Sequence, residues 1–111
     1  MNDRDVVIVE AVRTATGRRN GSLSGIHPVV LLSQALNEVM RRAGLPADVV
    51  EDVVCGCVDQ IGEQAANIGR NAMLAAGFPY TIPGAVRIAP ETLERDAVTL
   101  VGAGAVVLYC T

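Results

Sequence analysis

The chain has 111 residues, of which 50% are hydrophobic and only 3% aromatic, and its formal net charge is -3. This length allows one small domain, and the composition favours a core of Val, Leu, Ile and Ala, which is typical of a buried parallel sheet covered by helices. The hydrophobic content excludes global disorder. The basic residues are all arginine and are scattered along the chain, which excludes the usual basic surface of a nucleic-acid-binding protein.

We expect no secretion signal at the start of the chain. Charged residues at positions 3–5 come directly before the apolar run Val6–Val9, so no basic region followed by a long apolar stretch opens the sequence. Residues 97–110 form an apolar run that is too short to span a bilayer, for which about 20 residues are needed. We therefore expect a cytoplasmic location, with neither membrane nor nucleic acid among the partners.

The first half of the chain predicts a strand, a loop and a helix. The β-branched run Val6–Val9 favours a central strand that is buried on both faces. Residues 13–22 are polar and contain glycine, which is typical of a loop. From Pro28 to Ala43 apolar residues recur at the spacing of one helical stripe, with proline in the first turn and Gly44 just past the end.

The next segments predict a second strand and a second helix. Asp52–Val58 is apolar and predicts a strand, and the strand-helix-strand order implies that it pairs in parallel with Val6–Val9 through a right-handed crossover. After a polar connection, Ala65–Ala76 predicts a helix that Gly77 ends. This helix is apolar over most of its circumference, so we expect more than this one chain to bury it.

Two segments carry a resemblance to a known family. They read DVVIVEAVRTATGRRNGSLSG at residues 5–25 and GCVDQIGEQAANIGRNAMLAAGFPYTIPG at residues 56–84. Together they resemble the amino-terminal end of the thiolases, the acyl-CoA C-acyltransferases. The resemblance implies an α/β fold, the β-α-β-α start of the amino-terminal thiolase half, with a parallel sheet and covering helices. It divides the chain into a thiolase-like segment, residues 1–84, and a tail, residues 85–111, that does not match the family.

The resemblance also implies an activity, together with a reason why this chain lacks it. Thiolases catalyse thiolysis or Claisen condensation of acyl-CoA thioesters, with a coenzyme A thioester as substrate, no other cofactor, and a homo-oligomer interface. Their nucleophilic cysteine follows the Pro-Gly corner, at the position where this chain has Glu91. A carboxylate cannot replace a thiolate in transthioesterification, so we predict that the chain is inactive alone. The alternative is a non-catalytic, thiolase-like interaction module.

None of the three cysteines of the chain is expected to replace the missing nucleophile. Cys55 and Cys57 point to one face of an apolar strand, where thiols are inert packing groups, and two thiolates supply only half of a zinc site. Cys110 is next to the last residue and has no base nearby in sequence. His27 stands at a helix start, where an entry role is expected. We therefore assign no catalytic, cofactor-binding or metal-binding residue.

Five polar residues match the amino-terminal pattern of the family: Arg13, Gln60, Glu63, Asn67 and Arg70. We interpret them as structural, holding loops and the subunit interface rather than acting in catalysis. Asn67 and Arg70 are three residues apart on the predicted helix, so they share a face and could bind a neighbouring backbone or subunit.

The tail has a second interpretation. Val98–Gly104 is compatible with a strand that leads into the glycine-rich turn of a dinucleotide-binding fold. That turn requires a third glycine where this chain has Val107, and no helix follows. A core strand or helix within residues 97–110 is the favoured prediction.

Overall fold

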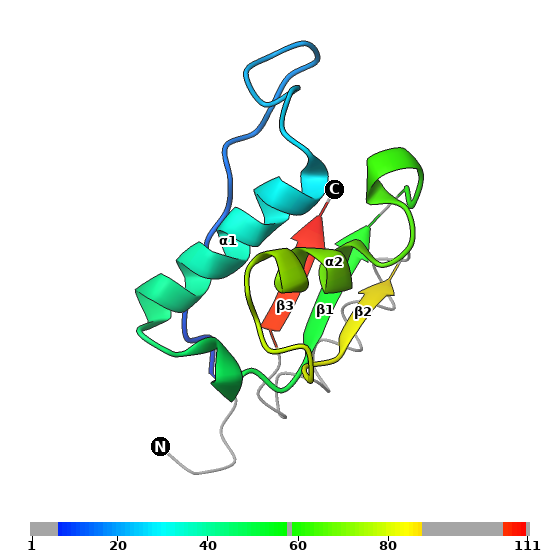
Figure 1. The fold of residues 1–111 in the computed structure, drawn as a ribbon. Coiled ribbons are helices and arrows are strands. Elements are labelled where there is room, and N and C mark those ends of the chain that lie inside the picture. Colours follow the sequence, from blue (N-terminus) through cyan, green and yellow to red (C-terminus); the bar gives the residue numbers. More distant parts are fainter. Residues whose placement is uncertain (1–6, 58, 88–105, 111) are drawn as a thin grey trace.

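The computed structural model describes residues 7–57, 59–87 and 106–110. In Figure 1, helix α1, Pro28–Ala43, and helix α2, Ile68–Ala75, lie on one face of a small sheet. The amino-terminal segment passes along α1 on the side of strand β3, Val106–Cys110. The expected α/β class, a parallel sheet with covering helices, is confirmed.

Helix α1 spans Pro28–Ala43, as its apolar spacing predicts. His27 caps it, because its Nδ1 accepts a hydrogen bond from the N–H of Val29 at 3.2 Å. Gly44 ends it with φ 67°, in the left-handed region where a side chain would be strained. Both ends of the predicted helix and the entry role of His27 are therefore confirmed.

Among the described residues, the sheet has three strands in the order β2-β1-β3. Strand β1, Val53–Cys57, lies in the centre and pairs in parallel with β2, Gly84–Arg87, and with β3, Val106–Cys110. Its five residues are all buried, as expected for a strand between two neighbours and under helices.

Helix α2 spans Ile68–Ala75 and begins later than the sequence predicts. A short 3-10 turn, η2, occupies Gly62–Gln64, and Ala66 has φ 61°, a left-handed conformation that no α-helix contains. The helix therefore starts only after Asn67, which caps it. Gly77 follows its end with φ 85°, as predicted.

The core lies between the two helices and β1. Buried side chains from all three elements meet there, together with one that precedes β1 and two from the segment after α2: Leu36, Val50, Val53, Ala72, Met73, Phe78 and Ile82. Gly69 allows α2 to approach the sheet closely, because a Cβ built at Gly69 would lie 2.8 Å from the Cβ of Cys55. A residue without a side chain is therefore required at that contact.

The predicted amino-terminal strand is wrong for the residues that can be described. Val7, Ile8 and Val9 belong to no strand and are 50%, 87% and 63% exposed. The expected parallel pair with β1 is also wrong, because β3 occupies the second edge of β1. One strand edge offers a single row of N–H and C=O groups, so it cannot pair with two segments at once.

Several predictions for the tail lie outside the described residues, among them those on Glu91 and on Val98–Gly104. Within residues 97–110, the described part, Val106–Cys110, is a strand. No helix in the described ranges has both the length and the apolarity needed to cross a membrane.

Candidate functional site

Two side chains at the start of α2, one of them the N-cap, bind the backbone of residues 78–84, the corner that leads into β2. We call Asn67 and Arg70 the carbonyl clamp. The Nδ2 of Asn67 donates to the carbonyl of Gly84 at 2.8 Å, and the Nη2 of Arg70 donates to that of Tyr80 at 2.7 Å. The Nη1 of Arg70 donates to the carbonyl of Ile82. Three alternate carbonyls of residues 80–84 are thus held by one helix.

Other contacts hold the same corner from the sheet side. The N–H of Val53 donates to the carbonyl of Pro83 at 3.1 Å, which ties the corner to the start of β1. A Cβ built at Gly84 would lie 3.1 Å from the Cα of Arg70, so the corner touches the backbone of α2. The corner is therefore fixed between helix and sheet, and it sets where β2 begins.

The start of α2 positions the clamp. The Oδ1 of Asn67 accepts a hydrogen bond from the N–H of Arg70 at 2.9 Å, the usual arrangement at a helix N-cap. One amide side chain thus uses its oxygen for the helix and its nitrogen for the corner. The interpretation that Asn67 and Arg70 hold a neighbouring backbone is confirmed.

The other three family-matched polar residues are not held in this way. Arg13 is exposed in the amino-terminal loop, Gln60 is half-buried after β1, and Glu63 is exposed in η2. Among the residues that the structure describes, these three side chains form no hydrogen bond or ion pair. Their roles stay predictions.

The buried cysteines of β1 pack against α2. Cys55 is 0% and Cys57 2% exposed, and both belong with Ile68 to one apolar cluster. The Sγ of Cys57 lies 3.4 Å from the carbonyl oxygen of Asp59 and 3.9 Å from the Oε1 of Gln64, as a thiol that donates weak hydrogen bonds. The predicted packing role on one face of the strand is confirmed, and Cys110 lies opposite Cys57 in the register of β3.

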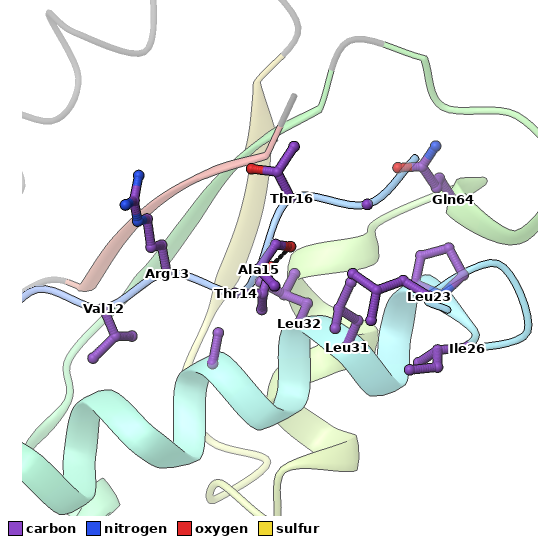
Figure 2. A pocket seen from close by; sticks show the side chains of 13 residues that line it. Val12, Arg13, Thr14, Ala15, Thr16, Leu23, Ile26, Leu31, Leu32 and Gln64 are labelled. Atoms are coloured by element: carbon purple, nitrogen blue, oxygen red, sulfur yellow. Dashed lines mark hydrogen bonds between the residues drawn. The ribbon is translucent and has the colours of Figure 1, made fainter. Parts of the chain in front are cut away.

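A groove opens between the amino-terminal loop and α1, with a volume of about 560 Å³ (Figure 2). Its apolar wall includes Leu23, Leu31 and Leu32, and Gln64 contributes a polar side chain from η2. Figure 2 shows Arg13 pointing to the opposite side of the loop from Val12, which faces α1. Our sequence reasoning missed Gln64, because nothing in its spacing separates it from the neighbouring polar residues of that connection.

The exposed side of α1 carries an ion-pair cluster. Glu38 contacts Arg41 at 2.6 Å and Arg42 at 2.7 Å. The hydrogen bonds from these two guanidinium groups lower the pKa of Glu38 to about 2, and the same carboxylate raises the pKa of Arg41. This cluster lies on the solvent side of the helix and serves its stability rather than a reaction.

In the described residues, several polar side chains build a framework. The clamp donates to backbone carbonyls, and His27 accepts a hydrogen bond from the backbone at a helix start. No group of three or more His, Cys, Asp or Glu side chains that could hold a metal ion occurs in residues 7–57, 59–87 and 106–110.

Comparisons with known proteins agree with this framework. The family model described as "Thiolase, N-terminal domain" matches residues 6–90. The chain is 48% identical over 80 residues to the steroid 3-ketoacyl-CoA thiolase FadA6 of Mycobacterium tuberculosis, which covers 72% of this chain and 20% of that protein. It is 41% identical over 85 residues to a 3-ketoacyl-CoA thiolase of Acinetobacter baumannii, covering 76% and 22% of the two chains.

A solved structure shows the same fold. The crystal structure of the Bacillus anthracis acetyl-CoA acetyltransferase aligns with a TM-score of 0.65 and 30% sequence identity, over 82% of this chain and 24% of that one. The chain spans about a fifth of the length of the curated relatives that it matches. Since the family model covers most of the sequence, this chain belongs to the thiolase family, in the part that forms the amino-terminal domain.

Proposed function

We propose that this chain forms the amino-terminal part of a thiolase-type acyl-CoA acyltransferase, an enzyme whose substrates are coenzyme A thioesters. The observation that supports the proposal is the match of residues 6–90 to the thiolase amino-terminal domain, a range that contains α1, β1, α2 and β2. The names of the relatives favour 3-ketoacyl-CoA thioesters as the substrate class.

We propose further that the chain does not catalyse this reaction by itself. Thiolase chemistry requires an activated thiolate, a general base and donors for the oxyanion. Cys55 and Cys57 are buried in an apolar cluster, and the sequence has Glu91 at the position of the family nucleophile. The described residues contribute the corner at the start of β2, which α2 and β1 hold by hydrogen bonds. Glu91 follows this corner in the sequence.

Thiolysis of a 3-oxoacyl-CoA by coenzyme A tests the activity. We expect the purified chain to consume the substrate at the rate of the reaction without protein, while an intact thiolase assayed in parallel turns it over. Turnover above that rate that a Cys57→Ala or Cys110→Ala substitution abolishes would contradict the proposal. Turnover that a Cys55→Ala substitution abolishes would contradict it equally, because Cys55 and Cys57 could act as a pair.

The boundary after Gly84 is tested at the level of the gene. We propose that a frame change near Gly84 replaces family sequence in the tail, although the family model still matches residues 85–90. The coding DNA beyond Pro83, read in all frames, is then expected to contain Thr-Val-(Asn/Asp)-Arg-x-Cys. Absence of this sequence from every frame would contradict a frame change.

A non-catalytic interaction module is the second candidate, and the exposed apolar side chains favour it. Ile8, Ile61 and Tyr80 are 87%, 72% and 78% exposed, so a partner that covers them would remove apolar surface from water. The expected partner is a second copy of the chain in the cytoplasm. We expect the purified chain to unfold cooperatively and light scattering to give the molar mass of a defined oligomer. An insoluble or unfolded chain would count against the module.

A further inference from the structure

The register of the sheet brings two cysteines side by side. Cys57 and Cys110 are partners in the parallel pair of β1 and β3. Neighbouring strands lie about 4.8 Å apart, and residues in register occupy the same face of the sheet. A disulfide requires a separation of about 4.4–6.8 Å between the two Cα atoms. The backbone of the two strands therefore already meets this requirement.

The other cysteine of β1 does not meet it. Cys55 is the register partner of Leu108, two residues before Cys110. With a rise of about 3.3 Å per residue, the Cα atoms of Cys55 and Cys110 are about 8 Å apart, too far for a disulfide without movement of the backbone. Cys55 and Cys57 lie along one strand, where their Cβ atoms are about 6.6 Å apart instead of the roughly 4 Å of a disulfide. The geometry thus favours one of the three possible pairs.

Cys57 lies at the border of the core. Its Sγ is 3.4 Å from the carbonyl oxygen of Asp59, which is exposed, whereas Cys55 lies in the middle of the strand. Within the described residues, both strands end at the pair of Cys57 and Cys110. The two Cβ atoms can therefore approach by the roughly 1 Å that a disulfide requires through a movement of the strand ends alone. The same local opening lets a small oxidant reach Cys57.

We infer that Cys57 and Cys110 form a disulfide when the chain meets a peroxide. One thiol first takes an oxygen from hydrogen peroxide and becomes a sulfenic acid, with release of one water. The second thiol then displaces the sulfenic oxygen as another water, and the S–S bond forms. Two electrons pass from the two sulfurs to the peroxide oxygens. The bond ties β3 to the thiolase-like segment, independently of any acyltransferase activity.

Oxidation of the folded full chain with hydrogen peroxide, followed by digestion with trypsin without reduction, tests the inference. We expect the chain to lose about 2 Da, the mass of two hydrogens. Peptide 43–70 is then joined to peptide 96–111, and fragmentation places the bond at Cys57. The Cys57–Cys110 bond is expected to exceed a Cys55–Cys110 bond at least about tenfold, because only the first pair is within reach. Equal yields of the two bonds, or no disulfide, would overturn the inference.

The unfolded chain provides the first control. In urea the two bonds to Cys110 are expected to form in about equal amounts, because the loops that they close differ by only two residues. A preference for Cys57 that is as large in urea as in the folded chain would contradict the inference, since it would not come from the register of the strands.

Single substitutions provide the second control. Cys55→Ser keeps the pair and is expected to retain the disulfide, whereas Cys57→Ser and Cys110→Ser are expected to lose it. A disulfide that persists within the chain in either of these two variants would overturn the inference. Cys110→Ser leaves β1 unchanged, so the test holds even if a substitution in β1 unfolds the chain. On a non-reducing gel the oxidised chain is expected to run as a monomer, and cross-linking only between two chains would contradict a bond within one sheet.

Discussion

The corner at residues 78–84 and the amino-terminal loop at residues 12–25 are both irregular connections, yet they are held very differently. The corner receives side-chain donors from α2 and a backbone donor from β1. In the loop, the hydrogen bonds between described residues are local, such as the one from the N–H of Gly21 to the carbonyl of Arg18 at 2.9 Å. A connection is fixed in space when donors from other elements reach its carbonyls, whatever its own polarity.

We therefore expect the two regions to respond differently to substitution. The corner depends on a few side chains of α2, so one substitution there removes several contacts at once. The loop depends on bonds within itself and lies over the leucines of the groove, so single substitutions in it remove little. Pairs of matched variants, one in each region, therefore test whether the contrast holds in solution.

The largest effect is expected for Arg70→Ala. It removes two hydrogen bonds from a charged donor to the corner and is expected to lower the free energy of unfolding by about 2–3 kcal/mol. Arg13→Ala, which removes an exposed arginine of the loop, is expected to change it by less than about 0.5 kcal/mol. Urea unfolding followed by circular dichroism measures both, and equal losses would break the comparison.

Gly69→Ala is expected to have a smaller effect. The added Cβ would lie 2.8 Å from that of Cys55, so α2 must move away from β1, at a cost of about 1–3 kcal/mol. Gly25→Ala is the control, because no atom lies within 4 Å of a Cβ built there. The thermal unfolding midpoints of the two variants test this. If Gly69→Ala is as stable as Gly25→Ala, α2 packs less closely against β1 than in the structure.

The smallest effect is expected for Glu38→Gln, outside both regions. The pKa of Glu38 is about 2 in the folded chain and 4.5 in the absence of partners, so its ion pairs stabilise the fold above pH 4.5. This contribution is lost as the pH falls through about 2. Because the pair is exposed, the difference is small and decreases with added salt.

Urea midpoints of the unmodified chain and Glu38→Gln, compared at neutral and at strongly acidic pH, measure this contribution. We expect a difference at neutral pH that disappears in acid. Glu51→Gln removes another exposed carboxylate and provides the control. A difference between the Glu38 variant and the unmodified chain that persists at the acidic end would contradict the assignment to ion pairing.

Elements whose signals are local could be predicted from the sequence. Helix α1 carries its own start and stop residues in His27, Pro28 and Gly44, and β1 is an apolar run between polar flanks. The first turn of α2 was predicted too early, because alanine at positions 65 and 66 favours a helix while the backbone at Ala66 is left-handed. Propensity alone could not reveal that turn.

Pairing between distant segments was not predictable in the same way. The run Val6–Val9 has the composition of a central strand, but which segment occupies an edge depends on every other candidate in the chain, including Val106–Cys110. The clamp could be predicted only in part. Its two residues were selected from the sequence, whereas their targets, the carbonyls of residues 80, 82 and 84, carry no side-chain signature.

That last property has a consequence for how the corner tolerates change. The clamp binds main-chain oxygens, so its hydrogen bonds do not depend on which side chains stand at two of these positions, Tyr80 and Ile82. Tyr80, Thr81 and Pro83 are all exposed. A library that randomises positions 80, 81 and 83 is therefore expected to keep folded members of widely different chemistry, as long as Asn67 and Arg70 are retained.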